Sequence, residues 1–324
     1  MISRRGCGLA AVVAVLLVGG LWAFFGGWYG SGPLEKEQHF IVPNGASLST
    51  VAERLEAQGV IRSATGFALR ARVFGGGSGI KAGEFAIPRG ASPSRVLAII
   101  SSDEVIRRFV TVPEGMPSIM VYERLKAQPA LTGDVAVPQE GSVLPDSYAF
   151  EKGESREALL RRMQVAMSRT VQELWAKRAP DLVVKTPAQA VILASIVEKE
   201  TGKPSERRMV AGLYSNRLKT GMLLQADPTI IYPITKGKRL GRRILQSEIQ
   251  AVNGYNTYTM VGLPQGPITN PSRESIAAVL NPARTDALYM VADGTGGHVF
   301  ASTLQEHNRN VAKWFAIRRE RGEL

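Results

Sequence analysis

The chain of 324 residues contains one cysteine, Cys7, and only three histidines. A single cysteine cannot form an internal disulfide, and it excludes the paired-cysteine motifs that hold structural zinc. The histidines, at positions 39, 298 and 307, are too far apart in the sequence for the ligand spacing of a local metal site. We therefore expect neither a metal ion nor another cofactor.

Charged residues are absent from residues 6–34. Within this stretch, residues 9–29 (LAAVVAVLLVGGLWAFFGGWY) have the length of a helix that crosses a bilayer. Arg4 and Arg5 precede the stretch, so the positive-inside bias places the N-terminus in the cytoplasm. A cleaved signal peptide is the alternative, but the sequence after the apolar run is a poor cleavage site.

We accordingly predict that residues 1–33 form a cytoplasmic tail and a single-pass anchor in the cell inner (plasma) membrane. The remaining body is then expected on the periplasmic or external side. Trp22, Trp28 and Tyr29 are expected to lie in an aromatic belt at the outer interface.

The formal net charge of +12 would suit nucleic acid, an anionic membrane surface or an acidic polymer. A body outside the cytoplasm makes nucleic acid a poor partner and a cell-wall polymer a better one. The basic run at residues 236–243 (KGKRLGRR) is expected to be a solvated loop.

A short signature occurs three times, at residues 40–45 (FIVPNG), 85–90 (FAIPRG) and 109–115 (FVTVPEG). Each copy runs from strand-like residues into a turn with proline and glycine, and helical periodicity follows. The glycine would allow a positive φ, and the proline would stop the strand. The unit predicted is a strand, a turn and a helix.

A helix with clear boundaries is predicted from residue 187 onward. Thr186 is a suitable N-cap, Pro187 suits the first turn, Gln189 can close a capping box, and Gly202 ends the helix. The interior, residues 190–197 (AVILASIV), is apolar on all sides, so the helix should be buried. A second helix, at residues 155–178, is expected to be a scaffold.

Two glutamates, Glu198 and Glu200, stand at the end of this apolar helix. A carboxyl group at the negative end of a helix, with apolar neighbours, should have a raised pKa and can serve as a general acid. The alternative is a pair of solvated glutamates that bind Lys203, Arg207 or Arg208. Periodicity alone does not decide which glutamate faces a cleft.

Six segments, in the same order, resemble motifs of the MltG (YceG-like) family of endolytic murein transglycosylases. They are residues 194–201 (ASIVEKET), 215–218 (SNRL), 221–229 (GMLLQADPT), 255–258 (YNTY), 262–268 (GLPQGPI) and 291–300 (VADGTGGHVF). The resemblance implies an α+β fold with a single N-terminal transmembrane helix, a LysM-like small α/β module at residues 34–110 and an α+β catalytic domain at residues 111–324.

The activity implied is non-hydrolytic cleavage of the bond between N-acetylmuramic acid and N-acetylglucosamine, which leaves a 1,6-anhydro end. Such a lyase would trim or terminate nascent glycan strands. Glu200 is the predicted acid, since Glu200-Thr201 resembles the Glu-Ser pair of other lytic transglycosylases, and Glu198 is the second candidate. Peptidoglycan strands and the membrane are the implied partners, together with peptidoglycan synthases or the division and elongation machinery.

Polar residues of the matched segments are predicted to line a glycan groove: Gln225, Asp227, Thr229, Tyr255, Asn256, Thr257 and Tyr258. The alternative for Asp227 is an ordinary role in the turn before Pro228. The alternative for Tyr255 and Tyr258 is packing in the core. For Asn216 and Arg217, a hydrogen bond to the substrate or to the catalytic helix is one interpretation, and a structural salt bridge is the more common alternative. The competing function for the whole chain is a catalytically silent scaffold that binds peptidoglycan.

Overall fold

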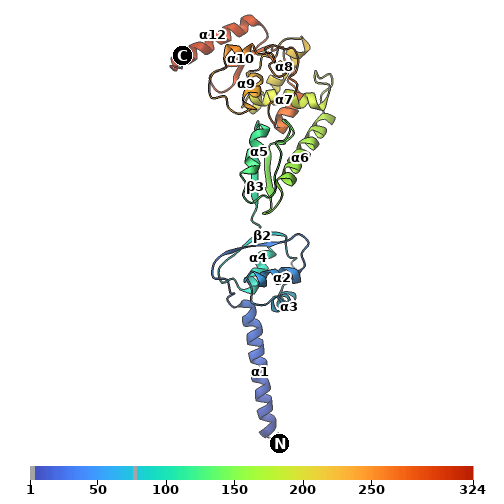
Figure 1. The fold of residues 1–324 in the computed structure, drawn as a ribbon, viewed down its shortest axis with the longest axis vertical. Coiled ribbons are helices and arrows are strands. Elements are labelled where there is room, and N and C mark those ends of the chain that lie inside the picture. Colours follow the sequence, from blue (N-terminus) through green and yellow to red (C-terminus); the bar gives the residue numbers. More distant parts are fainter. Residues whose placement is uncertain (1–3, 76–78, 324) are drawn as a thin grey trace. The chain divides into compact units, whose positions relative to one another are not determined.

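The computed structural model describes residues 4–75 and 79–323, with side chains except at positions 4–12, 21 and 23. The chain divides into two compact units, Met1–Arg108 and Phe109–Leu324 (Figure 1). Helices and strands occur in both units, so the α+β class is confirmed.

The first unit packs helices against a two-stranded sheet. Its elements are α1 (Arg4–Tyr29), β1 (Gln38–Val42), α2 (Leu48–Ala57), α3 (Ala64–Phe74), β2 (Gly83–Ile87) and α4 (Pro93–Ile100). The two strands are antiparallel, with Phe40 opposite Phe85, and both rings are fully buried in the core of this unit.

The C-terminal end of α1 belongs to the core of the first unit. Trp28 is 2% exposed, and its ring lies 5.8 Å from that of Phe67 and 5.9 Å from that of Phe74, between centroids. The prediction that Trp28 lies in an interfacial belt is therefore wrong, because the indole packs against α3.

Among the residues that the structure describes, no helix combines the length and the apolar character needed to cross a bilayer. The predicted anchor at residues 9–29 includes positions 9–12, 21 and 23, whose side chains lie outside the described part.

The second unit is mainly helical, with two sheets of two strands each: β3 pairs with β4, and β5 pairs with β6 as an antiparallel hairpin. Its first half contains β3 (Arg108–Val112), α5 (Ser118–Lys126), β4 (Asp146–Phe150), α6 (Arg156–Ala176) and α7 (Pro187–Glu200). Its second half contains η1 (Pro204–Glu206), α8 (Arg207–Lys219), α9 (Asp227–Thr235), α10 (Gln246–Ile249), α11 (Arg273–Leu280), β5 (Tyr289–Ala292), β6 (His298–Ala301) and α12 (Leu304–Glu320).

The three predicted units of strand, turn and helix are confirmed. Gly45, Gly90 and Gly115 have φ values of 73°, 65° and 68°, which side chains with a Cβ rarely adopt. Ser47 and Ser92 cap the first two helices, since their hydroxyls accept the amides of the residues three positions later. The third helix, α5, begins after Pro117 without a side-chain cap.

The central helix of the second unit is α7, which contacts α6, α8, α9 and α11. Its predicted start is confirmed, because the Thr186 hydroxyl accepts the Gln189 amide at 3.1 Å. Leu193 and Ile196 are fully buried in the surrounding core. The Ser195 hydroxyl also accepts the Ile268 amide at 3.1 Å, which fastens a neighbouring loop to the helix. The chain end of α7 is thereby held in a fixed place.

Candidate active site

Glu200 is the last residue of α7 and is partly buried among polar groups of three other segments. The pKa of Glu200 is raised to about 7, mainly by burial and secondly by the negative charge of Asp227. A hydrogen bond from Tyr214 and the positive charge of Arg217 act in the opposite direction. A carboxyl group with this pKa can give up a proton and take one back near neutral pH.

Asp227 and Tyr258, both predicted to bind substrate, form a direct pair beside Glu200. The Tyr258 hydroxyl donates to Asp227 Oδ1 at 2.6 Å. Burial and this hydrogen bond raise the pKa of the Tyr258 hydroxyl far above its ordinary value, so it remains a donor. The side chain of Asp227 is exposed and that of Tyr258 is partly exposed, so both are accessible to a ligand.

Three other predicted substrate residues, Thr229, Asn256 and Thr257, have fully buried side chains. The Thr229 hydroxyl donates to Ala226 O at 2.6 Å and lies 2.9 Å from that of Thr257. The Asn256 amide nitrogen donates to three backbone carbonyls, with the shortest distance, 2.7 Å, to that of Ala251. These side chains therefore hold two loops together beneath the exposed pair.

The last two predicted substrate residues lie at the surface of the same region. Gln225 has an exposed side chain and an unusual φ of 51°, and its amide donates to Thr257 O at 3.1 Å. Tyr255 is partly buried, with its ring centroid 4.8 Å from that of Tyr232. A tilted aromatic pair of this kind presents an apolar ring face.

Two residues of α8, Asn216 and Arg217, hold the loops near the site through hydrogen bonds to backbone carbonyls. Arg217 Nε donates to Leu288 O at 2.7 Å, and Nη1 donates to Leu224 O at 2.5 Å, so one guanidinium joins two loops. Asn216 does the same for the carbonyls of Thr285 and Ala287. Both residues therefore support the site through backbone contacts.

Tyr214 is the residue at this site that the sequence analysis missed. Its side chain is 2% exposed, and its hydroxyl is hydrogen-bonded to Glu200. The available signal was a tyrosine on the buried face of a helix directly before the SNRL segment.

Glu198, the second candidate acid, has a different environment from Glu200. Its side chain is 4% exposed, and Oε2 accepts the Ser272 amide at 2.8 Å and the Ser272 hydroxyl at 2.5 Å. Arg207 Nη2 lies 3.7 Å from Oε1. Ser272 is the N-cap of α11, so Glu198 joins the end of α7 to the start of α11.

A further contact fixes the chain just after Glu200. Glu206 Oε2 accepts the Thr201 hydroxyl at 3.3 Å and lies 2.8 Å from His298 Nδ1. The backbone amide of His298 also donates to Glu206 Oε1 at 3.0 Å. The hairpin of β5 and β6 is thereby attached to the segment that follows α7.

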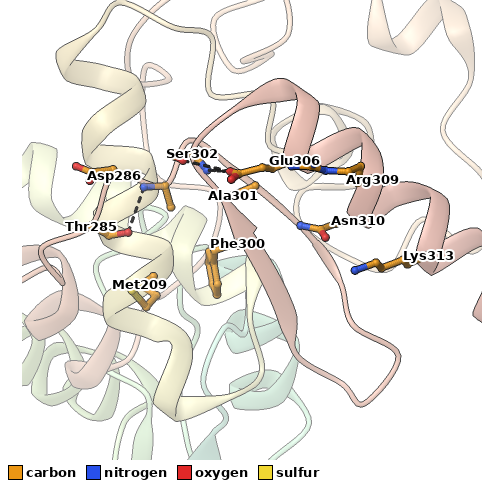
Figure 2. A pocket seen from close by; sticks show the side chains of 11 residues that line it. Met209, Thr285, Asp286, Phe300, Ala301, Ser302, Glu306, Arg309, Asn310 and Lys313 are labelled. Carbon is orange, nitrogen blue, oxygen red and sulfur yellow. Dashed lines mark hydrogen bonds between the residues drawn. The ribbon is translucent and has the colours of Figure 1, made fainter.

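A separate pocket of about 620 Å³ lies between the start of α8, residues 285–287, β6 and α12. Figure 2 shows Glu306 directed toward Ser302, with Arg309, Asn310 and Lys313 along one side. None of the predicted site residues, all of which lie in the described part of the chain, lines this pocket. This pocket is therefore distinct from the group of residues around Glu200.

One partly buried carboxyl group with a raised pKa thus lies near an exposed carboxylate and a phenol, an arrangement suited to acid and base chemistry. A profile of the YceG-like family matches residues 40–313. The chain therefore belongs to the YceG-like family, and the resemblance noted in its motifs is confirmed.

Individual relatives agree with this assignment. The chain is 28% identical over 343 residues to an endolytic murein transglycosylase of Bacillus subtilis, covering 94% of this chain and 93% of the relative. It is 35% identical over 181 residues to an endolytic murein transglycosylase of Streptococcus pneumoniae, covering 54% of this chain and 32% of the relative. A crystal structure of a yceG-like protein from Listeria monocytogenes has the same fold, with a TM-score of 0.54, 24% identity and coverage of 85% of this chain and 98% of the other.

Proposed function

We propose that the protein is an endolytic peptidoglycan lytic transglycosylase with Glu200 as its only acid and base. The observation that carries this proposal is the position of Glu200, a carboxyl group partly buried at the end of α7 beside Asp227, where burial raises its pKa. The relatives named as murein transglycosylases support the choice of substrate. Asp227, the carboxyl group beside Glu200, is exposed and accepts from the Tyr258 hydroxyl, so we give it no part in proton transfer.

One carboxyl group is sufficient for this reaction. Glu200 first donates its proton to the glycosidic oxygen of N-acetylglucosamine, and the bond from that oxygen to the anomeric carbon of N-acetylmuramic acid breaks. The resulting carboxylate then takes the proton of the 6-hydroxyl of the same muramic acid, and that oxygen bonds to the anomeric carbon. Glu200 returns to its protonated form, and no water is consumed, unlike in hydrolysis by two carboxylates.

The neighbouring groups fit this sequence of steps. The exposed carboxylate of Asp227 would stabilise positive charge that develops at the anomeric carbon. Gln225, Tyr255 and Tyr258 would contact the sugars, while Thr229, Asn256 and Thr257 would hold the loops that carry them.

The pH dependence of kcat/KM tests the role of Glu200. Because the protonated form donates, and its pKa is about 7, the rate should be constant in mildly acidic solution and should fall above pH 7. Asp227→Asn removes a negative charge that raises this pKa, so the falling limb should move to lower pH. The matched control is Asp286→Asn, at an exposed aspartate outside the site, which should leave the limb in place. An unmoved limb in Asp227→Asn would contradict the assignment.

The two domains would have different functions. Residues 111–324 would be the catalytic domain, and residues 34–110 a LysM-like module that binds glycan. The order β1, α2, α3, β2, with an antiparallel strand pair, supports a small module of this kind. The alternative for the whole protein is a silent peptidoglycan-binding scaffold, which the environment of Glu200 disfavours.

We further propose that residues 9–29 anchor the protein in the inner membrane, with the body on the far side and close to nascent strands and their synthases. Val15, Leu16 and Trp22 of α1 are 71%, 69% and 80% exposed, which is costly in water. Added protease should therefore degrade the body of the protein in intact spheroplasts. Protection of the body until the membrane is lysed would contradict this topology.

A further inference from the structure

A pocket of about 520 Å³ lies at the C-terminal end of α7 and the start of α9. Two of its lining residues are Lys199 and Pro228, the chain neighbours of Glu200 and Asp227. The opposite walls come from the turn between β3 and α5 and from the loop that follows α9. The pocket therefore adjoins the ends of the two helices that carry Glu200 and Asp227.

The floor of this pocket is apolar. Met116, Met120, Ile231, Leu240 and Ile268 line it, together with three prolines. All of its lining residues belong to the described part of the chain, and none of them is aromatic. A sugar subsite would be expected to offer ring faces for stacking and polar side chains for hydroxyl groups. The floor instead suits small aliphatic groups.

The rim of the pocket has an excess of positive charge. Lys199, Lys238 and Arg239 lie there, with Glu114 as the acidic member of the lining. Glu114 is paired with Arg207 at 2.5 Å, and Lys238 is paired with Glu123 at 2.5 Å. Within the described residues, Lys199 and Arg239 have no carboxylate partner within 4.0 Å, and both side chains are exposed. Two cations are thus available to an anionic ligand.

Close packing between the basic loop and the turn before α5 forms two walls of the pocket. Gly237 has a φ of 82°, and a Cβ at this position would lie 2.7 Å from the Cβ of Pro117. Only glycine therefore lets the loop approach the turn so closely. The Thr235 hydroxyl donates to Lys238 O at 2.8 Å, which fixes the start of the basic loop.

We propose that this pocket is a subsite for the acidic stem peptide carried by N-acetylmuramic acid. The inference rests on the proposed function, because it takes the position of Glu200 as the position of the cleaved bond. The peptide is attached through a lactyl group to the same sugar whose anomeric carbon reacts, so its first residues lie beside the bond. Their methyl groups would contact the apolar floor, and a free carboxylate would meet Lys199 and Arg239.

The test compares two substrates with the full chain: glycan strands that keep their peptides and strands stripped of peptides by an amidase. Lys199→Gln and Arg239→Gln should each raise KM about tenfold on peptide-bearing strands, because each removes one charge-assisted contact. Neither substitution should change KM on stripped strands. Lys219→Gln and Arg243→Gln, which remove exposed cations outside the pocket, are matched controls and should change neither substrate.

A second measurement does not depend on catalysis. Titration calorimetry should detect binding of a soluble stem tetrapeptide to Glu200→Gln, and binding should weaken when Arg239→Gln is added. Equal increases of KM on both substrates would show that the pocket takes a sugar, and no change on either would show that it takes no part of the substrate. Both results overturn the inference while leaving the proposed function intact. Absence of anhydro products from both substrates with the wild-type chain would instead overturn the proposed function.

Discussion

Glu200→Gln is expected to lower kcat/KM for glycan cleavage by about three orders of magnitude, because a positioned general acid contributes about 10²–10⁴ in rate. The amide cannot donate the proton that the leaving oxygen needs. It retains the size of the side chain, so KM should change little. The measurement is a steady-state assay on isolated glycan strands with both forms of the full chain.

Stability provides the control for this loss of activity. In the wild type, the pKa of Glu200 rises from 4.5 to about 7 on folding. The contribution of this group to the free energy of unfolding is therefore fully present below pH 4.5 and is lost as the pH rises through 7. An amide has no such loss. Glu200→Gln should therefore be more stable than the wild type at pH 8, by about 2 to 3 kcal/mol after allowance for partial exposure. If Glu200→Gln were less stable than the wild type, its loss of activity would be explained by unfolding and not by the missing acid.

Glu198→Ala is expected to lower the free energy of unfolding by about 3 kcal/mol, as removal of one partner from a buried ion pair does. The substitution leaves Arg207 with Glu114 alone and takes away the acceptor of the Ser272 amide and hydroxyl. Chemical denaturation measures the loss. Below the unfolding transition, the variant should keep most of its activity per folded molecule.

Glu198→Gln is the matched variant at this position, since its carbonyl oxygen still accepts from Ser272. Its loss of stability should be smaller than that of Glu198→Ala. The opposite pattern, an inactive but stable Glu198→Gln together with an active Glu200→Gln, would reverse the roles assigned to the two glutamates.

Local signals predicted the helix that carries both glutamates. Thr186, Pro187 and Gln189 specify the start of α7 within a few residues, and these are short-range interactions. Proline and glycine likewise specified the three turns, because only glycine tolerates their backbone conformation at low cost. Such features depend on neighbours in the sequence, so the sequence alone was sufficient.

The choice between Glu198 and Glu200 depended on residues distant in the sequence. Glu198 meets Ser272, and Glu200 meets Tyr214 and Asp227. Helical periodicity separates the directions of the two side chains, but it does not say what each direction contains. The contact of Glu206 with His298 was missed for the same reason, since the two residues are 92 positions apart.

The predicted substrate residues differ in their exposure. Asp227 and Tyr258 are accessible, whereas Thr229, Asn256 and Thr257 are fully buried and hydrogen-bonded within the protein. Polar residues in a matched segment can serve the loop conformation as well as a ligand. Burial separates the two roles, and burial is a property of the tertiary structure.

The most direct test of the central claim is mass spectrometry of muropeptides released from purified peptidoglycan by the full chain, beside Glu200→Gln. The account predicts 1,6-anhydro-muramyl ends, one water lighter than hydrolytic ends, and their loss in the variant. Hydrolytic ends, or anhydro ends that persist in Glu200→Gln, would contradict it, and a folded wild-type chain that binds glycan but releases nothing would favour the scaffold.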